Sequence, residues 1–491
     1  MLNRLMFQAS RKLEMPKNRL LPYLLVCTSF ILLNTYAIIN GSYWVSYLPV
    51  LVAIFLMVFF ELERALLLLT FLIPLSINFD DVGYGLGISL PDEPFIILIM
   101  FLSVFKIFIK SEYHLDVFRH PITVALLINF GWMLFTAFTS DMPFVSLKFM
   151  LSRFWYIVVF YFMAVMLFIK RENISKYLWL YIASLSLVII YALIRHGAAG
   201  FTRETSYTLM QPFYAAHGIY AAAIAFFIPF LVISCVFYNR FLSHGISRIL
   251  VLLVLGLFAA GLVFSFTRAA WLSVMGLAFI LVPLMLRVRL RTLVLLVGTG
   301  LLLFVVFQNQ VYYVLSKTQD VSSSDLSVHL KSVANVKSDA SNAERINRWM
   351  SAIGMFKERP ITGFGPGTYM FCYAPFQQSN YTTIISTNFG DVGNAHSEYL
   401  GPLAESGVMG LLTLLILIYV VLQTAFRLFY DGRTAYVRYM ALSVMLGLIT
   451  YLIHGVMNNY IESDKIAVLW WGGMAVITAL DLYHNHSKNQ A

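Results

Sequence analysis

Charged residues and cysteines are scarce in this chain of 491 residues. Asp, Glu, Lys and Arg make up only 12% of it, whereas 60% of the residues are hydrophobic. Soluble globular domains carry about 25% charged residues, so the composition excludes that class and indicates an integral membrane protein. The three cysteines, Cys27, Cys235 and Cys372, are scattered and odd in number, which argues against a disulfide framework and a cysteine-rich metal site.

Several motifs of common enzyme chemistry are also missing. The sequence contains no Asp-x-Asp pair, no His/Cys cluster with metal-ligand spacing and no Gly-rich loop of the Walker or dinucleotide-binding type. Carboxylates in the loops that we expect on the outer side are few and dispersed, which argues against a divalent metal. We therefore expect no metal, no nucleotide and no other cofactor.

Apolar runs recur along the chain, and many have the length of about 20 residues that a helix needs to cross a bilayer. The first run is too long for the apolar part of a signal peptide and lacks a small-residue cleavage site, so we expect it to remain as a span. The sequence thus predicts an all-α polytopic helix bundle of 12–14 transmembrane helices. The fourteen candidate spans are 20–39, 43–60, 65–79, 94–109, 121–139, 151–169, 176–194, 212–236, 248–266, 269–286, 292–308, 407–426, 436–456 and 465–483.

Lys and Arg concentrate in alternate loops, as the positive-inside rule requires if the amino terminus is cytoplasmic. Both termini are then cytoplasmic, and much of the net charge of +10 is a topology signal, so we expect no nucleic-acid binding. This orientation divides the chain into a first transmembrane bundle (1–308), a large outer loop with short helices (309–406) and a last transmembrane part (407–491).

Three residues far apart in sequence, Arg203, Arg268 and His396, fall on the outer side in this topology. Arg268 lies between two spans with almost no loop, so its side chain either extends to lipid headgroups or binds a phosphate that faces the bundle. Arg203 either binds the same anion or pairs with Glu204. Two further arginines of the outer loop, Arg345 and Arg348, are either surface charges or ligand contacts.

His396 is the strongest candidate for a catalytic group. Asn394 is a suitable N-cap for a helix that runs on through Glu398 toward the next span, so we expect His396 in its first turn. The positive end of the helix dipole and nearby arginines favour the neutral imidazole, which can accept a proton. The alternative is a surface histidine without function.

A glycine cluster, Gly363, Gly365 and Gly367, follows Arg359-Pro360. Glycines at this spacing either bring backbone N–H groups close to an anion or form a tight turn. The spacing does not match a nucleotide-binding pattern.

These segments resemble a known family. The stretches Arg345-Ile-Asn-Arg-Trp349, 359–369 and His396-Ser397-x9-Gly407-x-x-Gly410 are similar to motifs of the O-antigen ligase/polymerase family of bacterial envelope glycosyltransferases, in a ligase-like form. Arg268 and Arg203 resemble that family's arginines at an outer span end and in an earlier outer loop. The resemblance covers residues 200–270 and 340–415.

The resemblance implies a metal-independent membrane glycosyltransferase of the GT-C type. Such a ligase moves a glycan from undecaprenyl diphosphate to lipid A–core at the periplasmic face of the bacterial inner membrane, with inversion at the anomeric carbon. By this resemblance His396 is the base and Arg203 and Arg268 bind the diphosphate. Other residues are expected to pack or support the site: Gly407 and Gly410 by close helix packing, and Tyr399 and Glu405 from behind the base.

Other functions fit the same membrane setting. A polysaccharide polymerase or a protein O-oligosaccharyltransferase would use the same donor with another acceptor. A polysaccharide transporter would carry charges within its spans or internal repeats, and the sequence shows neither convincingly. His217, at the start of a candidate span, is expected to be a packing histidine.

Overall fold

The computed structural model describes residues 17–79, 88–109, 115–241, 246–296, 298–299, 340–379 and 393–485. Most of the candidate span 292–308 and the first part of the predicted loop 309–406 lie outside these ranges. The described part is helical apart from one short antiparallel pair, β1 (Ile77–Phe79) and β2 (Ile88–Leu90). The prediction of an all-α chain is confirmed.

Nine helical segments of the described part are long and apolar enough to cross a membrane, which confirms the predicted polytopic fold. They are α2 (Lys17–Ile39), α7 (Pro121–Phe138), the continuous segment Pro143–Leu167 that begins with α8 (Pro143–Ile157), α10 (Arg171–Ala198), α11 (His217–Val236), α14 (Arg268–Met285), α19 (Leu400–Asp431), α20 (Ala435–His454) and the segment Asp464–His484 that begins with α21 (Asp464–Ala479). Other apolar helices are α3 (Leu48–Phe60), α5 (Asp92–Ile109) and α13 (Arg248–Phe264).

One candidate span, 65–79, does not form a continuous helix. Helix α4 (Leu62–Leu72) gives way to a short 3-10 turn that contains Pro74, and β1 follows. Proline lacks the N–H that a continuing helix needs, so the prediction of one long span here was wrong.

The chain divides into two compact units, residues 1–65 and 66–491. In the first unit, α2 exposes apolar side chains along its length, among them Leu25, Ile31 and Ile39. Such a surface suits a helix surrounded by lipid. The second unit contains every candidate site residue.

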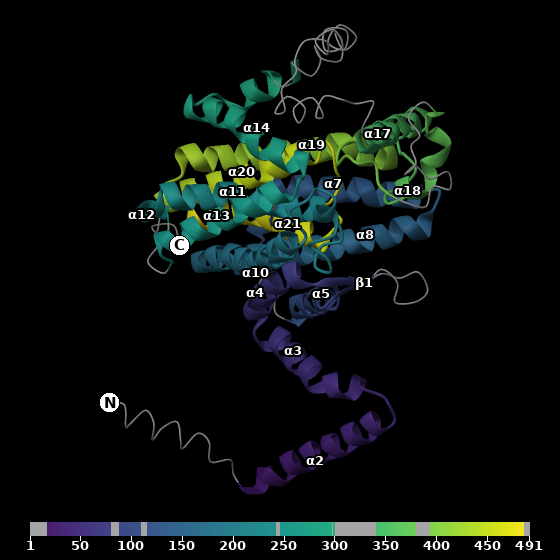
Figure 1. The fold of residues 1–491 in the computed structure, drawn as a ribbon, viewed down its shortest axis with the longest axis vertical. Coiled ribbons are helices and arrows are strands. Elements are labelled where there is room, and N and C mark those ends of the chain that lie inside the picture. Colours follow the sequence, from purple (N-terminus) through teal and green to yellow (C-terminus); the bar gives the residue numbers. More distant parts are fainter. Residues whose placement is uncertain are drawn as a thin grey trace. The chain divides into compact units, whose positions relative to one another are not determined.

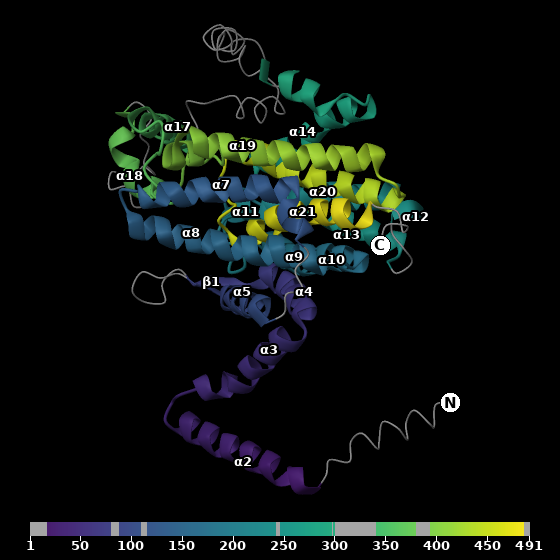
Figure 2. The same ribbon diagram turned by 180° about the vertical axis from the view of Figure 1, so that it is seen from behind.

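Helices α11 and α20 form the centre of the second unit and are buried over most of their length (Figure 1). They approach closely because Gly447 has no side chain: a Cβ there would lie 2.7 Å from the carbonyl oxygen of Phe226. Around this pair, α21 packs on α20 and α13 on α10. Figure 2 shows α7 and α19 side by side along one face of the bundle.

The two ends of the second unit carry different elements. Helices α17 (Ala340–Glu358) and α18 (Tyr369–Cys372) lie at one end, beside the start of α19 and the end of α7 (Figure 1). The short helix α12 (Tyr238–Phe241) and the end of the described chain lie at the other. We refer to them as the α17 end and the α12 end.

Candidate functional site

The glycine cluster and the first turns of α19 are joined by backbone hydrogen bonds at the α17 end. Phe364 N–H donates to the carbonyl oxygen of Ala404 (3.2 Å), and Gly365 N–H donates to that of Glu405 (2.8 Å). The Glu405 carboxylate accepts from the N–H of Tyr369 (2.9 Å). These backbone N–H groups already donate to acceptors of the protein itself. Of the two alternatives for the glycine cluster, the geometry therefore corresponds to a tight turn and not to an anion-binding loop.

Helix α19 is kinked at Gly407, where the φ angle of 68° is strained for any residue with a side chain. A Cβ at Gly407 would lie 2.1 Å from the carbonyl oxygen of Ile361, and one at Gly363 would lie 2.3 Å from the carbonyl carbon of Glu405. The two glycines therefore allow the backbones of their segments to touch. This contact joins the motif of residues 359–369 to the motif that runs from His396 to Gly410.

Helix α7 stabilises the kink from the side. The indole Nε1 of Trp132 donates to the carbonyl oxygen of Ser406 (2.8 Å), and Thr136 Oγ1 donates to Ser406 Oγ (3.2 Å). Kinks leave helical carbonyls without their usual partners, and the bond from Trp132 gives the Ser406 carbonyl a partner, while Thr136 holds the Ser406 side chain. Gly410 lies one turn further along, where a Cβ would overlap the Ser406 side chain.

His396 lies in a turn before α19 and not in a helix. The helix begins at Leu400, and the Asn394 side chain accepts from the His396 N–H (3.0 Å), which closes the turn. His396 adopts a φ of 49° there. The prediction that Asn394 caps a helix with His396 in its first turn was wrong, because Ser397 Oγ accepts from the N–H of Leu400 and stands at the helix start.

Two neighbouring segments hold this turn in place. Trp349 of α17 donates its Nε1 to the carbonyl oxygen of His396 (3.1 Å). The Asn394 side-chain amide donates to the carbonyl oxygen of Asn459, in the loop after α20 (3.0 Å). The backbone of the His396 turn is therefore fixed by contacts among three segments that are distant in sequence: the turn itself, α17 and the loop after α20.

Glu398 is an anchor that the sequence motif did not reveal. Its buried carboxylate accepts from the N–H groups of Tyr460 (2.7 Å) and Ile461 (2.9 Å) and from the hydroxyl of Tyr451. Burial raises the pKa of Glu398, and these hydrogen bonds oppose the rise. The carboxylate thus ties the histidine turn to α20 and to the loop before α21.

Arg348 is neither a surface charge nor free to move. Its Nε donates to Glu344 (2.7 Å), both side chains are about 5% exposed, and the guanidinium lies over the ring of Tyr373 at 4.1 Å. Buried ion pairs of this kind fix geometry because either partner alone would be strongly destabilising. Arg348 therefore positions α17.

Arg345, nearly one turn before Arg348, acts on the candidate base. Burial, followed by the charges of Arg345 and Arg348, lowers the pKa of His396 to about 4, while Glu344 opposes the shift. His396 is therefore neutral at physiological pH and can accept a proton. The sequence predicted a neutral imidazole from a helix dipole and from nearby arginines; the arginines contribute, whereas His396 lies before the helix begins.

Two further histidines, His217 and His454, lie within electrostatic range of Arg345. His217 begins α11 and packs edge-on against Tyr207 at 4.6 Å, as a packing histidine would. His454 ends α20, is 1% exposed, and neither ring nitrogen has a hydrogen-bond partner among the described residues. Buried polar groups are usually paired, so His454 is unusual. Its place at the end of a candidate span was the available signal.

The two predicted diphosphate ligands lie at the same end in different settings. Arg203 is exposed in the loop between α10 and α11, forms no ion pair with Glu204 in the structure as described, and acts electrostatically on His217. Arg268 is half-buried at the first position of α14, a helix that packs along α20.

Tyr399 and Glu405 face the scaffold and not the histidine. The hydroxyl of Tyr399 donates to the carbonyl oxygen of Leu452 in α20 (2.9 Å), and Glu405 receives the hydrogen bond from Tyr369 described above. Across the part of the chain that the structure describes, no three His, Cys, Asp or Glu side chains come together as metal ligands.

Part of the chain matches a known family model. The family model described as O-Antigen ligase matches residues 252–415, a range that contains Arg268, the glycine cluster, His396 and the kink of α19. The comparison with curated proteins found no match. Together with the apolar helices, the family match indicates a membrane glycosyltransferase of the O-antigen ligase/polymerase type. Residues 252–415 of this chain are thus similar to the O-antigen ligase family.

Proposed function

We propose that this chain transfers a glycan from undecaprenyl diphosphate to a hydroxyl group of lipid A–core at the periplasmic face of the bacterial inner membrane. The family match supports the general type of reaction. The observation that carries the proposal is the neutral His396, held by three segments at the end of the bundle where Arg203, Arg268 and Arg345 also lie.

The reaction is a single displacement. The acceptor hydroxyl oxygen attacks the anomeric carbon, the bond from that carbon to the diphosphate oxygen breaks, and the electron pair leaves with the diphosphate. His396 takes the hydroxyl proton on a ring nitrogen. Arg203 and Arg268 bind the diphosphate and stabilise its growing charge, so the leaving group needs no protonating acid and no metal.

Donor binding also strengthens the base. Without substrate, burial and two arginines hold the pKa of His396 at about 4, which makes the imidazole a weak base. A bound diphosphate brings negative charge next to these arginines and favours the imidazolium. His396 then becomes a better proton acceptor at the moment when the donor is in place.

The membrane orientation and the domain organisation are part of the proposal. Arginines gather at the α12 end, which the positive-inside rule places in the cytoplasm, so the α17 end faces the periplasm. The basic residues at the α12 end include Arg240, Arg248, Arg287, Arg427, Arg433 and Arg438. In this orientation the chain consists of a first transmembrane bundle (1–308), a large periplasmic loop (309–406) and a last transmembrane part (407–491).

Transfer in vesicles tests the proposal. Full-length protein is reconstituted with purified undecaprenyl-diphosphate glycan and lipid A–core, and product formation and donor binding are measured separately. We expect His396→Ala to lower turnover by about 10² to 10⁴-fold while donor binding remains. Near-normal turnover of this variant would dismiss His396 as the base.

The same vesicles separate the related functions through the acceptor. Product on lipid A–core supports a ligase, elongation of a second lipid-linked glycan indicates a polymerase, and product on Ser or Thr of a protein indicates a protein O-oligosaccharyltransferase. Movement of the glycan across the bilayer without a new glycosidic bond would identify a transporter.

A further inference from the structure

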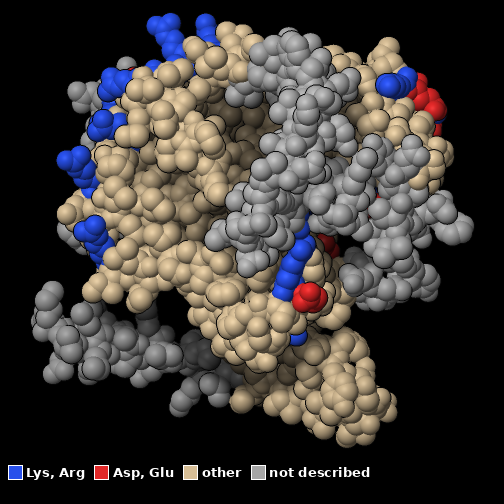
Figure 3. Space-filling model, turned by 45° about the horizontal axis from the view of Figure 1, so that its top comes forward, with Lys and Arg blue, Asp and Glu red and all other residues tan. Residues whose placement is uncertain are grey.

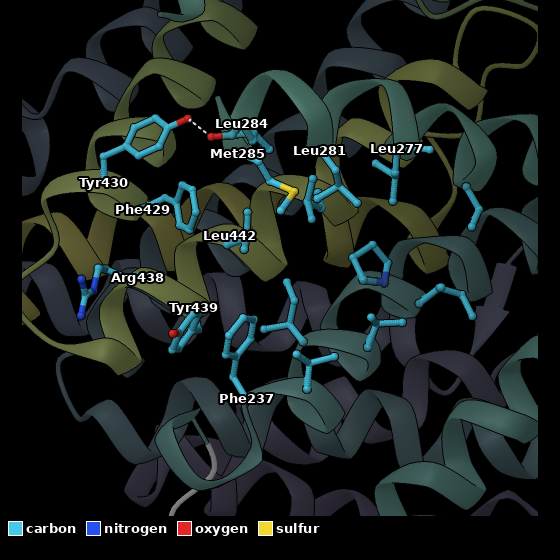
Figure 4. Close-up of a pocket in the computed structure, with 18 of the residues that line it drawn as sticks. Phe237, Leu277, Leu281, Leu284, Met285, Phe429, Tyr430, Arg438, Tyr439 and Leu442 are labelled. Carbon is cyan, nitrogen blue, oxygen red and sulfur yellow. Dashed lines mark hydrogen bonds between the residues drawn. The ribbon is translucent and has the colours of Figure 1, made fainter. Parts of the chain in front are cut away.

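A large apolar cavity lies at the α12 end, far along the helices from His396. Its volume is about 700 Å³, and it lies among α11, α14, α19 and α20 (Figure 4). Leu277, Leu281 and Met285 line it from α14, and Leu442 faces them from α20. Walls of this kind suit a hydrocarbon chain and not a sugar.

The polar groups of this cavity stand at one end. Arg287 follows the last turn of α14, and Arg438 lies in the first turn of α20; both line the cavity together with Tyr430 and Tyr439. The hydroxyl of Tyr430 donates to the carbonyl oxygen of Leu284 (2.9 Å), which fixes the end of α14 against α19.

Further positive charge adjoins this polar end. A neighbouring cavity of about 300 Å³ shares Arg287 and Tyr430 with the first and is also lined by Arg289, Arg291 and Arg427. Arg427 pairs with Asp481 (2.6 Å), but within the described ranges no carboxylate pairs with Arg287 or Arg438. An apolar cavity thus opens beside Arg287 and Arg438, which no carboxylate of the described residues neutralises.

The backbone at Arg287 is unusual as well. Its φ is 54°, at the turn after a helix where glycine is the usual residue. Its N–H donates to the carbonyl oxygen of Leu284 (3.1 Å), so the turn is a regular helix end apart from the side chain. Residues held in this conformation against their preference are often retained for function.

We propose that this cavity binds an acyl chain of an anionic phospholipid whose phosphate group is held by Arg287 and Arg438. The apolar part of the cavity would hold the acyl chain, and the arginines at its polar end would contact the phosphate group. Basic pockets between transmembrane helices on the cytoplasmic side are suited to anionic headgroups. This site is independent of the glycosyl-transfer proposal, since none of its lining residues belongs to the candidate active site.

Lipid binding to the delipidated full-length protein tests the headgroup contact. Native mass spectrometry compares phosphatidylglycerol with phosphatidylcholine of the same acyl chains. We expect the wild type to prefer phosphatidylglycerol and the preference to fall by about fivefold for each arginine removed, in Arg287→Gly and Arg438→Gln. Glycine suits the φ of residue 287, so the first variant keeps the turn. Arg433→Gln is the matched control, since Arg433 lies at the same end but lines neither cavity.

A second pair of variants tests the acyl chain. Ala278 lines the cavity, whereas its neighbour Phe279 is 82% exposed and does not. We expect Ala278→Trp to abolish binding of both phospholipids and Phe279→Trp to leave it unchanged. Equal binding of the two phospholipids to the wild type, or displacement of phosphatidylglycerol by a polyprenyl diphosphate, would overturn the proposal.

Discussion

Arg348 and Arg359 at the α17 end pair with carboxylates, whereas no described carboxylate pairs with Arg287 or Arg438 at the α12 end. At the α17 end, Arg348 is buried against Glu344, and Arg359 pairs with Asp141 at 2.6 Å. At the α12 end, Arg287 and Arg438 are exposed, and Figure 3 shows basic side chains along the left edge, which is this end of the bundle. A paired arginine fixes geometry, most strongly where the pair is buried as with Arg348, whereas exposed arginines without a described partner remain available to lipid headgroups. The comparison therefore predicts that mutations are costly at the α17 end and mild at the α12 end.

The largest effect is expected at the kink of α19. In Gly407→Ala, the new Cβ would overlap the carbonyl oxygen of Ile361, and the φ of 68° would be strained. We expect a loss of about 3 kcal/mol or more in stability, measured by thermal unfolding in detergent. Gly256→Ala in α13 is the control, because a Cβ there meets nothing within 4 Å. Equal melting temperatures for the two variants would contradict the interlocked backbone.

A smaller loss of stability is expected when the Glu398 carboxylate is replaced. Glu398→Gln keeps the shape but replaces a charged acceptor of three hydrogen bonds with a neutral one. We expect stability to fall by about 1–3 kcal/mol and the transfer rate to fall with it, because the His396 turn loosens. Glu358→Gln, an exposed change in α17, should do neither. An unaltered melting curve for Glu398→Gln would show that the Glu398 carboxylate does not stabilise the His396 turn.

The pH dependence of transfer examines the charge around His396 without unfolding the protein. Burial and Arg345 lower the pKa of His396 to about 4, so activity that needs the neutral imidazole is lost as the pH falls through that value. Removing the charge in Arg345→Met raises the pKa, so the acid limb of kcat/KM moves to higher pH. Arg345→Lys keeps the charge and should leave the limb in place. A limb that is identical in the Met variant would show that Arg345 does not act on the base.

The smallest effect is expected at the α12 end. Arg287→Gly relieves a left-handed conformation, so we expect thermal stability in lipid-free detergent to rise by about 1 kcal/mol. His396 also has a positive φ, of 49°. His396→Gly should nevertheless not raise transfer activity, because it removes the proposed base. A destabilised Arg287→Gly protein would mean that the side chain holds the fold, which would remove the contrast between the ends.

Much of the candidate site was proposed from local sequence patterns. The sequence pointed to His396, the glycines and the arginines because each stands in a polar segment between apolar runs. His454 and Glu398 could not be identified in that way. A histidine at a span end and a glutamate beside a motif look ordinary in the sequence. The structure shows that His454 is buried with no hydrogen-bond partner among the described residues and that Glu398 accepts three hydrogen bonds.

The sequence by itself determined that this is an all-α membrane protein, because hydrophobic length and loop charge act locally and survive without tertiary contacts. Only the tertiary structure decided that the glycine cluster serves the kink of α19, and that His396 lies in a turn instead of a helix. Those outcomes depend on contacts such as Gly363 against Glu405 and Trp349 against His396, which join residues more than 40 positions apart. No local pattern encodes which distant backbone will come close enough to compete for a hydrogen bond.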